Sequence, residues 1–347
     1  MSNSTEAHYN NREECSHVVA TSFTVVLSTI SLLAVTGNLL VIITFIKTAN
    51  LRTSPNYYIV NMAVSDFIAV ILNWPLYATE GMLKPGGNII VDPNLAAFAC
   101  KLGIYSRAVS YVVSVASLVL IAVDRFIATA FPLKALQTTG RIRIILLLLS
   151  WILPALCLIP YLVYSKIVDF ENRSFCKTMI SSVAHNAYNI VSFVLFYLVP
   201  MIVIFVLYPL IIKYSRRSRA ARLHNEARNG ITNTKRDKQN QNIMKIFGSI
   251  ILMFFTCWTP LYVYLFLTSR YQSILVKDKC LILVGLFYYT LPLLSSAVNP
   301  LILIAFSSSY RAAIKSVCRT SFPKCSVGYT APGASPQGQN IELQELK

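Results

Sequence analysis

Seven long apolar segments run through this 347-residue sequence, separated by short polar stretches and one longer basic stretch. A bilayer core about 30 Å thick requires roughly 20 apolar residues per spanning helix. Soluble proteins rarely bury helices of this length without charges, and only 13% of the residues here are charged. We therefore predict an all-α membrane protein, a seven-transmembrane helix bundle. The expected spans are Ala20–Ile46, Asn56–Met82, Ala99–Phe131, Arg143–Tyr164, Asn186–Lys213, Ile243–Thr268 and Leu281–Phe306.

Basic residues indicate how the bundle is oriented. The net charge is +17, and Lys and Arg concentrate between the fifth and sixth spans, after the third span and beyond the seventh. Short loops rich in Lys and Arg stay in the cytoplasm, so we expect a multi-pass plasma-membrane protein with an extracellular N-terminus and a cytoplasmic C-terminus. The same charge attracts anionic membrane lipid. Binding of nucleic acid would require an exposed domain, so we expect no nucleic-acid partner.

The polar ends divide the chain into four expected regions. Residues 1–19 form an extracellular N-tail, 20–306 the bundle, 307–318 an amphipathic helix on the membrane surface, and 319–347 a disordered cytoplasmic tail. Sequons for glycosylation at Asn3 and Asn172 both fall on the expected outer side. The first residues are polar and lack the apolar core of a cleavable signal peptide, so we expect the first span to direct its own insertion.

The eight cysteines divide by their expected compartment. Only the four on the outer side face an oxidising environment, and four cysteines permit three pairings. We favour a bond between Cys100 and Cys176, which would hold the loop after the fourth span over the bundle. Cys15 and Cys280 would then form a second bridge. On the inner side, Cys318 and Cys325 are either free thiols or sites of palmitoylation.

Each span carries a short motif, and the motifs occur in a fixed order. They are Gly37-Asn38, Asn61-Met62-Ala63-Val64-Ser65-Asp66, Asp124-Arg125-Phe126, Trp151, Pro200 with Tyr208, Phe254 with Cys257-Trp258-Thr259-Pro260, and Asn299-Pro300. With these motifs the chain resembles the rhodopsin-like (class A) G-protein-coupled receptors, from the first span to about Cys325. The resemblance implies a receptor, not an enzyme, that activates a heterotrimeric G protein through outward movement of the cytoplasmic end of the sixth helix. It also implies arrestin and receptor kinases as partners.

Asp66 is a lone carboxylate near the middle of the bilayer. It must therefore be protonated or share a cation or polar partners. Helix packing could bring Ser114, Asn38, Ser296 and Asn299 to it. The resemblance implies a sodium ion at Asp66 and Ser114, with Asn299 nearby, as an allosteric ligand; the alternative is a hydrogen-bonded polar core. We expect no other cofactor.

Two features of the sequence are typical of a conformational switch. Asp124 and Arg125 form a charge pair where the third helix meets the cytoplasm, and such a pair can act as a latch. Pro260 should kink the sixth helix, with Phe254 and Trp258 on its inner face, so ligand contact could swing the inner end.

Pro200 and Pro300 similarly weaken the fifth and seventh helices, although prolines are also simply tolerated in membrane helices. Leu303 stands where the family's Asn-Pro-x-x-Tyr motif has its tyrosine, so Tyr208 would lack its usual partner in the active state. Phe126 replaces the tyrosine of the family's Asp-Arg-Tyr motif. Asn240 and Gln241 lie where an acid is often found, so we expect a looser latch.

The ligand is constrained by a few positions. Leu293 stands where retinal-binding relatives have a lysine, which argues against light sensing. Amine receptors have an aspartate where this chain has Arg107. A guanidinium facing the bundle requires an acidic partner, either a ligand group or Glu80 of the second helix, and both remain open.

Tyrosines dominate the expected lining around Arg107. The other candidates are Tyr77, Tyr111, Tyr262, Tyr289, Ser192 and His185. Such residues suit a peptide or a small organic ligand. The stretch from Leu51 to Asn61 resembles the neuropeptide branch of the family, so a peptide is the first choice and an acidic small molecule or lipid the second.

Two other classes of membrane protein are less consistent with the sequence. A transporter would usually contain internal repeats, which we do not find. A membrane enzyme would need a catalytic cluster, and the four histidines neither cluster nor lie beside inward-facing acids.

Overall fold

The computed structural model describes residues 2–79, 92–131, 140–170, 173–178, 182–229, 234–270 and 284–321. The α-helices are α1 (Ser2–Lys47), α2 (Ser54–Thr79), α3 (Pro93–Ala130), α5 (Gly140–Cys157), α6 (Ile159–Tyr164), α7 (Ser182–Phe193), α8 (Val199–Asn229), α9 (Thr234–Arg270), α11 (Leu291–Phe306) and α12 (Ser308–Ser321). The remaining elements are a short 3-10 helix η1 (Ala49–Leu51), π-helical segments η2 (Val194–Leu198) and η3 (Val284–Thr290), and strands β1 (Ser165–Phe170) and β2 (Arg173–Thr178).

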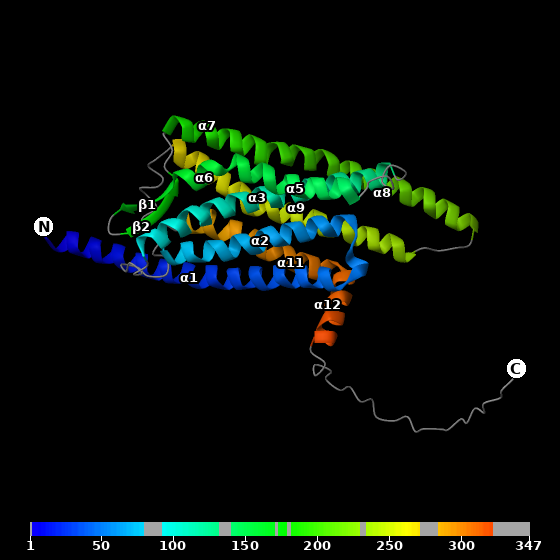
Figure 1. Ribbon diagram of the computed structural model, residues 1–347, viewed down its shortest axis with the longest axis horizontal. Helices are drawn as coiled ribbons and strands as arrows, with labels where there is room; N and C mark the ends of the chain where they lie inside the picture. The colour runs from blue at the N-terminus through cyan, green and yellow to red at the C-terminus, as the bar shows by residue number, and fades with distance from the viewer. Residues whose placement is uncertain are drawn as a thin grey trace, which may run out of the picture.

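Within these residues, seven helical stretches are long and apolar enough to cross a membrane, and they run side by side (Figure 1). The prediction of a seven-transmembrane bundle is confirmed. The stretches are Thr21–Lys47, Ser54–Trp74, Pro93–Ala130, Gly140–Cys157, Ala187–Ala220, Met244–Leu267 and Leu286–Phe306. Each overlaps the span expected from the sequence.

Several helix boundaries differ from the expected spans. Helix α3 begins at Pro93 before Ala99, α8 continues to Asn229 beyond Lys213, and α9 begins at Thr234 before Ile243. The fourth span was expected to continue to Tyr164, but α5 ends at Cys157 and the short helix α6 follows. Pro160 lies in the first turn of α6, where its missing N–H is tolerated, and cannot continue α5 as a regular helix. At the amino end, α1 begins at Ser2, so the backbone of the expected N-tail is helical and continuous with the first span.

Many apolar side chains face outward along the bundle. Phe205 and Leu252 are 64% and 66% exposed, although they lie in the middle of long helices. Exposure of these side chains to water would be costly, whereas exposure to hydrocarbon is not. The helices also satisfy their own backbone hydrogen bonds, as a membrane requires. This surface fits a lipid environment.

Helix α3 lies at the centre of the bundle and contacts α2, α5, α6 and α8. It begins with a strong cap, because the Asp92 carboxylate accepts hydrogen bonds from the backbone N–H groups of Asn94 and Leu95 at 2.8 and 3.1 Å. Pro93 takes the first helical position, where no N–H partner is required. The start of α3 is thus fixed by local sequence.

Asn61 joins three helices through its side chain. Its amide nitrogen donates to the hydroxyls of Ser117 on α3 and Ser150 on α5, at 3.0 and 3.1 Å. Its carbonyl oxygen accepts from the indole nitrogen of Trp151 at 2.8 Å. In an apolar surrounding these bonds have no competition from water, so they fix α2, α3 and α5 in register.

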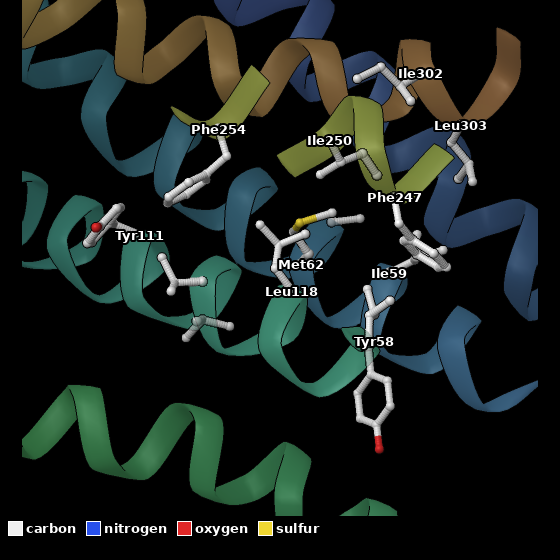
Figure 2. Packing of buried hydrophobic residues seen from close by; sticks show 14 of the residues in the cluster. Tyr58, Ile59, Met62, Tyr111, Leu118, Phe247, Ile250, Phe254, Ile302 and Leu303 are labelled. Atoms are coloured by element: carbon white, nitrogen blue, oxygen red, sulfur yellow. The ribbon is translucent and has the colours of Figure 1, made fainter. Parts of the chain in front are cut away.

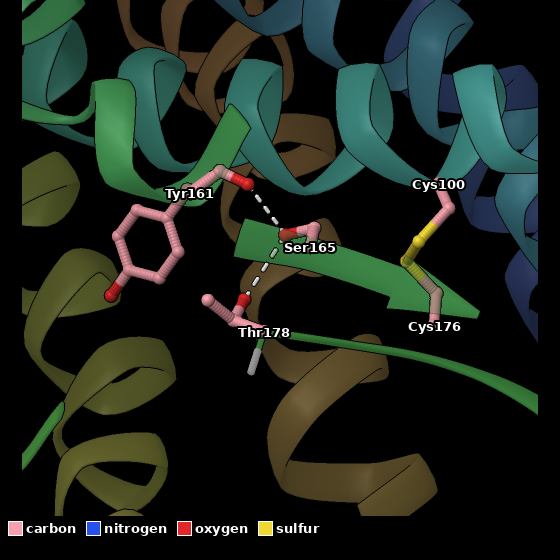
Figure 3. The surroundings of a disulfide bond; sticks show 5 residues. All are labelled: Cys100, Tyr161, Ser165, Cys176 and Thr178. Atoms are coloured by element: carbon pink, nitrogen blue, oxygen red, sulfur yellow. Dashed lines mark hydrogen bonds between the residues drawn. A yellow bond between two sulfur atoms is a disulfide. The ribbon is translucent and has the colours of Figure 1, made fainter. Parts of the chain in front are cut away.

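The antiparallel hairpin of β1 and β2 lies at one end of the bundle, which we call the hairpin end (Figure 1). The opposite end, where α12 turns away from the bundle axis, is called the α12 end. Cys176 on β2 forms a disulfide with Cys100 on α3, which confirms the favoured pairing (Figure 3). Ser165 at the start of β1 donates to the carbonyl of Tyr161 and is hydrogen-bonded to Thr178. The hairpin is therefore attached both to α3 and to α6.

The second expected disulfide cannot be followed here, since Cys280 and the side chain of Cys15 lie outside the described residues. The same holds for Asn172, Cys325 and the side chain of Asn3. Cys318 is a free, exposed cysteine on α12.

Helix α12 occupies the position expected for the amphipathic helix. Tyr310, Ala313 and Val317 form its buried face, whereas Arg311 and Lys315 are exposed. Burial raises the pKa of the Tyr310 phenol above its usual range. Arg311 also donates to the last carbonyls of α11, which stabilises the junction between the two helices.

Candidate functional site

Two cavities meet inside the bundle at Arg107. The first, which we call the carboxylate cavity, has a volume of about 40 Å³ and is lined by Asp66, Asn73, Arg107, Ser110, Ser114 and residues of α9 and α11. The second, which we call the tyrosine cavity, has a volume of about 120 Å³. Its lining includes Tyr111, Tyr161, Tyr262, Tyr288, Ser192 and Arg107. Arg107, Tyr111 and Trp258 line both cavities, so the two are neighbours with a common wall.

The guanidinium of Arg107 lies on tyrosine rings from the start of the seventh span. Its central carbon is 4.3 Å from the ring centroid of Tyr288 and 5.6 Å from that of Tyr289. Arg binds aromatic faces well because its planar charge is weakly hydrated. Of these two tyrosines, the sequence predicted only Tyr289. Both belong to the π-helical segment η3.

A group of aromatic rings lies between the cavities at Arg107 and helix α9. The ring of Tyr111 lies 4.1 Å from Trp258 and 5.7 Å from Phe254, measured between centroids. Tyr262 lies 4.5 Å from Tyr197, whose hydroxyl is hydrogen-bonded to Thr259 on α9. The sequence did not single out Tyr197, because its place in η2 depends on a π-turn that no local signal identifies.

Several expected ligand contacts cannot be placed. The side chains of Tyr77, Glu80 and His185 lie outside the described residues, and so does any pairing between Arg107 and Glu80. Ser192, Tyr111 and Tyr262 line the tyrosine cavity, as expected. Tyr289 instead lines the carboxylate cavity.

The Asp66 carboxylate is 3% exposed and accepts three side-chain hydrogen bonds. One oxygen accepts from the hydroxyls of Ser114 and Ser296, both at 3.1 Å. The other accepts from the amide of Asn299 at 3.0 Å. The amide of Asn38 donates to the backbone carbonyls of Ala34 and Ser296, and no hydrogen bond joins it to Asp66 among the described residues. Its role is to hold α1 against α11 beside the acidic group.

Trp258 lies between the two cavities and is held by one hydrogen bond. Its indole nitrogen donates to the hydroxyl of Ser295 on α11 at 3.0 Å. Phe254, one turn away on α9, stacks beside it at 5.9 Å, and Pro260 lies within the same helix. A side chain that enters the tyrosine cavity would therefore press on the part of α9 that has lost a backbone hydrogen bond.

At the α12 end, Arg125 pairs with its neighbour Asp124. Two guanidinium nitrogens donate to one carboxylate oxygen, at 2.9 and 3.2 Å. Arg125 also lines a small apolar cavity together with Tyr208, Met244 and residues of α3. Helix α3 thus carries both arginines that the sequence singled out, Arg107 near its middle and Arg125 near its last turn.

Tyr208 is bound to α9 in this structure. Its hydroxyl donates to the backbone carbonyl of Met244 at 3.0 Å. The ring lies over Gly248, and a Cβ atom there would overlap the Tyr208 hydroxyl. The absence of a side chain at Gly248 is therefore what allows Tyr208 to reach α9.

Leu303 is 2% exposed and packs in an apolar layer with Ile59, Met62 and Ile250 (Figure 2). A tyrosine hydroxyl in this layer would have to find a polar partner. Pro300, one turn away, packs directly on Gly37 of α1, where a Cβ atom would approach the proline ring to 2.7 Å. Small size at Gly37 is thus required for α1 to approach α11.

Comparison with known proteins agrees with this architecture. The family model described as "7 transmembrane receptor (rhodopsin family)" matches residues 37–303. The chain is 26% identical to Tachykinin-like peptides receptor 86C of Drosophila melanogaster, over 84% of this chain and 57% of that receptor. It is 28% identical to the Neuromedin-K receptor of Cavia porcellus, over 82% of this chain and 62% of that receptor. For the KiSS-1 receptor of Mus musculus the identity is 25%, over 84% and 73% of the two chains. The chain therefore spans about three fifths of the length of the first two relatives.

Proposed function

Because the chain belongs to the rhodopsin family of seven-transmembrane receptors, we propose that it is a plasma-membrane receptor for an extracellular peptide and activates a heterotrimeric G protein. The observation that carries this proposal is the tyrosine cavity, which adjoins Trp258 on the proline-containing helix α9. The similarity to a protein named as a receptor for tachykinin-like peptides supports a peptide ligand. In this arrangement the hairpin end faces the outside and the α12 end the cytoplasm.

The size of the tyrosine cavity limits how a peptide can bind. Pockets that enclose a whole small ligand typically measure about 300–1,000 Å³, whereas this one measures about 120 Å³. One or two terminal side chains of a peptide fill such a volume, and the rest of the peptide lies toward the β1–β2 hairpin. Arg107 gives the cavity a preference for an acidic group, because a guanidinium binds a carboxylate through two parallel hydrogen bonds.

Signal transmission follows from the contacts around Trp258. A ligand group that displaces Tyr111, directly or through its neighbour Tyr262, moves the ring that packs on Trp258. The bond from Trp258 to Ser295 is the restraint that must yield. Pro260 then serves as the hinge about which the inner half of α9 swings outward. That movement separates Met244 from Tyr208 and opens the surface around Arg125 to the G protein.

The Asp66 cluster supports a sodium ion in the inactive state as part of the same function. Hard cations prefer oxygen ligands, and the carboxylate and the Ser114 hydroxyl supply them. The cavity of about 40 Å³ has room for a small ion and about two waters, at about 10–15 Å³ for each water. These residues fit the ion, and Asn299 and Ser296 orient the carboxylate.

Further partners follow from the proposed topology. Receptor kinases and arrestin act on the cytoplasmic tail, and palmitoylation of Cys318 would fix α12 to the membrane surface. Asn3 and Asn172 carry glycans on the outer side.

A peptide screen tests the proposal. Cells that express the receptor with a promiscuous G protein are exposed to matched peptides with free and amidated C-termini, and surface expression is measured for each variant. We expect free-acid peptides to drive guanine nucleotide exchange, with a loss of potency of at least about tenfold in Arg107→Ala, a desolvated ion pair being worth about 1.4 kcal/mol or more. Lys101→Ala, which removes a cation from α3 without touching either cavity, is the matched control.

Two results would contradict the proposal. If small carboxylates or acidic lipids activate exchange while no peptide does, the second candidate, a receptor for an acidic small molecule or lipid, is correct. If no ligand or mutation changes nucleotide exchange at normal surface expression, the chain is not a G-protein-coupled receptor.

A further inference from the structure

Tyr310 carries a buried hydroxyl near the start of α12. The residue is 1% exposed, and it is the largest of the fully buried side chains in the described part of the chain. Its hydroxyl oxygen has no hydrogen-bond partner among the described residues. Buried hydroxyls are normally paired, because an unpaired one loses its hydrogen bonds to water without replacement. The proposed signalling mechanism does not use this group.

The local backbone fixes where this hydroxyl lies. The N–H group of Tyr310 donates at 3.2 Å to the hydroxyl of Ser307, which caps the start of α12. The next residue, Arg311, donates to the carbonyls of Ile304 and Ala305 at the end of α11. Helix α12 also contacts α1 and α11 directly. The ring is therefore held against the bundle, and turning it toward solvent would break these bonds.

The Tyr310 ring has apolar surroundings. Tyr310 belongs to the same hydrophobic cluster as Leu303, Ile59 and Ile250, which form the apolar layer of Figure 2. Ile250 is the member of that layer that comes from α9. An outward movement of the inner half of α9 would therefore remove Ile250 from the layer and admit water to the cluster from the α12 end.

We propose that the Tyr310 hydroxyl biases the receptor toward signalling without ligand. In the closed arrangement, which is the one in this structure, the hydroxyl is buried without a partner. In the open arrangement, in which the inner half of α9 has moved outward, water reaches it. Only the closed arrangement bears the cost, so the hydroxyl favours opening. This inference rests on the proposed receptor function and adds a residue that the contacts around Trp258 do not include.

Two tyrosines at the α12 end then act in opposite directions. The Tyr208 hydroxyl donates to the carbonyl of Met244 and stabilises the closed arrangement, whereas the Tyr310 hydroxyl destabilises it. Each effect is worth about fivefold or more in an equilibrium constant. The two hydroxyls share no hydrogen-bond partner in the described ranges, so their effects on the equilibrium should multiply. The ligand-free activity is set by the balance between them.

Tyr310→Phe tests the proposal, because it removes the hydroxyl and keeps the ring in its place. Ligand-free guanine nucleotide exchange, normalised to surface receptor, should fall at least about fivefold. In the Tyr208→Phe background, where exchange is higher, the same change should return exchange close to the wild-type level. The melting temperature of the purified full-length receptor in lipid nanodiscs should rise by about 2 °C or more.

Tyr105→Phe is the matched control, because it removes the same atom from a hydroxyl that has a partner. The Tyr105 hydroxyl donates to the carbonyl of Ala155 at 2.8 Å and joins α3 to α5, far from the moving half of α9. This variant should lower the melting temperature and leave ligand-free exchange within about twofold of wild type. Opposite signs of the two temperature shifts would distinguish an unpaired hydroxyl from a paired one.

Three results would overturn the proposal. If Tyr310→Phe lowers the melting temperature or leaves it unchanged, a bound water pairs the hydroxyl in the closed arrangement. If the melting temperature rises but exchange in the Tyr208→Phe background stays the same, the hydroxyl has the same cost in both arrangements. Both of these results leave the proposed receptor function intact. Absence of exchange from every variant with every ligand contradicts that function, and the bias with it.

Discussion

Replacing Gly248 by alanine should make the receptor signal without ligand. The Tyr208 hydroxyl joins α8 to α9 by its bond to Met244, and it reaches that carbonyl across the bare backbone of Gly248. A Cβ atom at position 248 would overlap the hydroxyl and lie 3.2 Å from the ring carbon that bears it. The tyrosine ring is the end of a flexible side chain, so it moves aside while the helices keep their fold.

The magnitude follows from the one hydrogen bond that is lost. A hydrogen bond of this kind contributes about 1 kcal/mol, which corresponds to about a fivefold change in an equilibrium constant. This hydrogen bond exists only in the closed arrangement, in which Tyr208 binds Met244. Once α9 has moved, Leu303 offers Tyr208 no hydroxyl to bind, so the open arrangement has no bond to lose. Alanine also favours the helix over glycine by up to about 1 kcal/mol. Thermal stability should therefore stay nearly constant while the open fraction rises.

Ligand-free guanine nucleotide exchange, normalised to surface receptor, measures the open fraction. Gly248→Ala and Tyr208→Phe should each raise it about fivefold. The double variant should match the single variants, because both changes remove the same bond and phenylalanine leaves no hydroxyl to displace. Unchanged exchange in Tyr208→Phe, or effects that multiply in the double variant, would refute the reasoning.

Three further variants test other contacts. Asp124→Asn should raise ligand-free exchange about two- to fivefold, because its pair with Arg125 is partly exposed and contributes up to about 1 kcal/mol; no rise would exclude a latch. Asn61→Ala removes the hydrogen bonds to Trp151 and two serines, and should lower the stability of the purified receptor by about 2–3 kcal/mol in thermal unfolding. An unchanged melting temperature would mean that the network carries no net energy. Cys176→Ser opens a bridge between residues 76 apart, worth up to about 4 kcal/mol, and should reduce surface delivery and peptide response. Mild reduction should then weaken wild type but not the variant.

The sequence predicts the bundle well, because the length and polarity of its apolar segments are set by the bilayer itself. The spans agree within a few residues at most ends. Arg107 and Asp66 could be identified as well, since a charged residue inside an apolar segment is costly and usually serves a function. That they share one cavity could not be foreseen, because it depends on how α2, α3 and α11 pack together.

The contacts that the sequence missed are those made by shape rather than by charge. The sequence gives no sign that Gly248 is required, because its role depends on the ring of Tyr208, which packs against it from another helix. Tyr288 was missed because its position depends on a π-turn. Asn38 was expected on the carboxylate, but its amide nitrogen donates to the backbone carbonyls of Ala34 and Ser296. Each of these depends on the exact approach of two helices, which residue patterns along one helix do not encode.

The π-helical segment Val194–Leu198 affects how this receptor is aligned with its relatives. A π-turn holds one residue more than an α-turn, so the helix outward of it is rotated relative to a regular helix counted from Pro200. In a receptor whose fifth helix is regular, the place of Ser192 is then taken by a residue one position closer to the proline. Transferring binding residues between the two by simple counting would select the neighbour of the intended side chain, such as Phe193, which packs on Tyr197 and Tyr262, in place of Ser192.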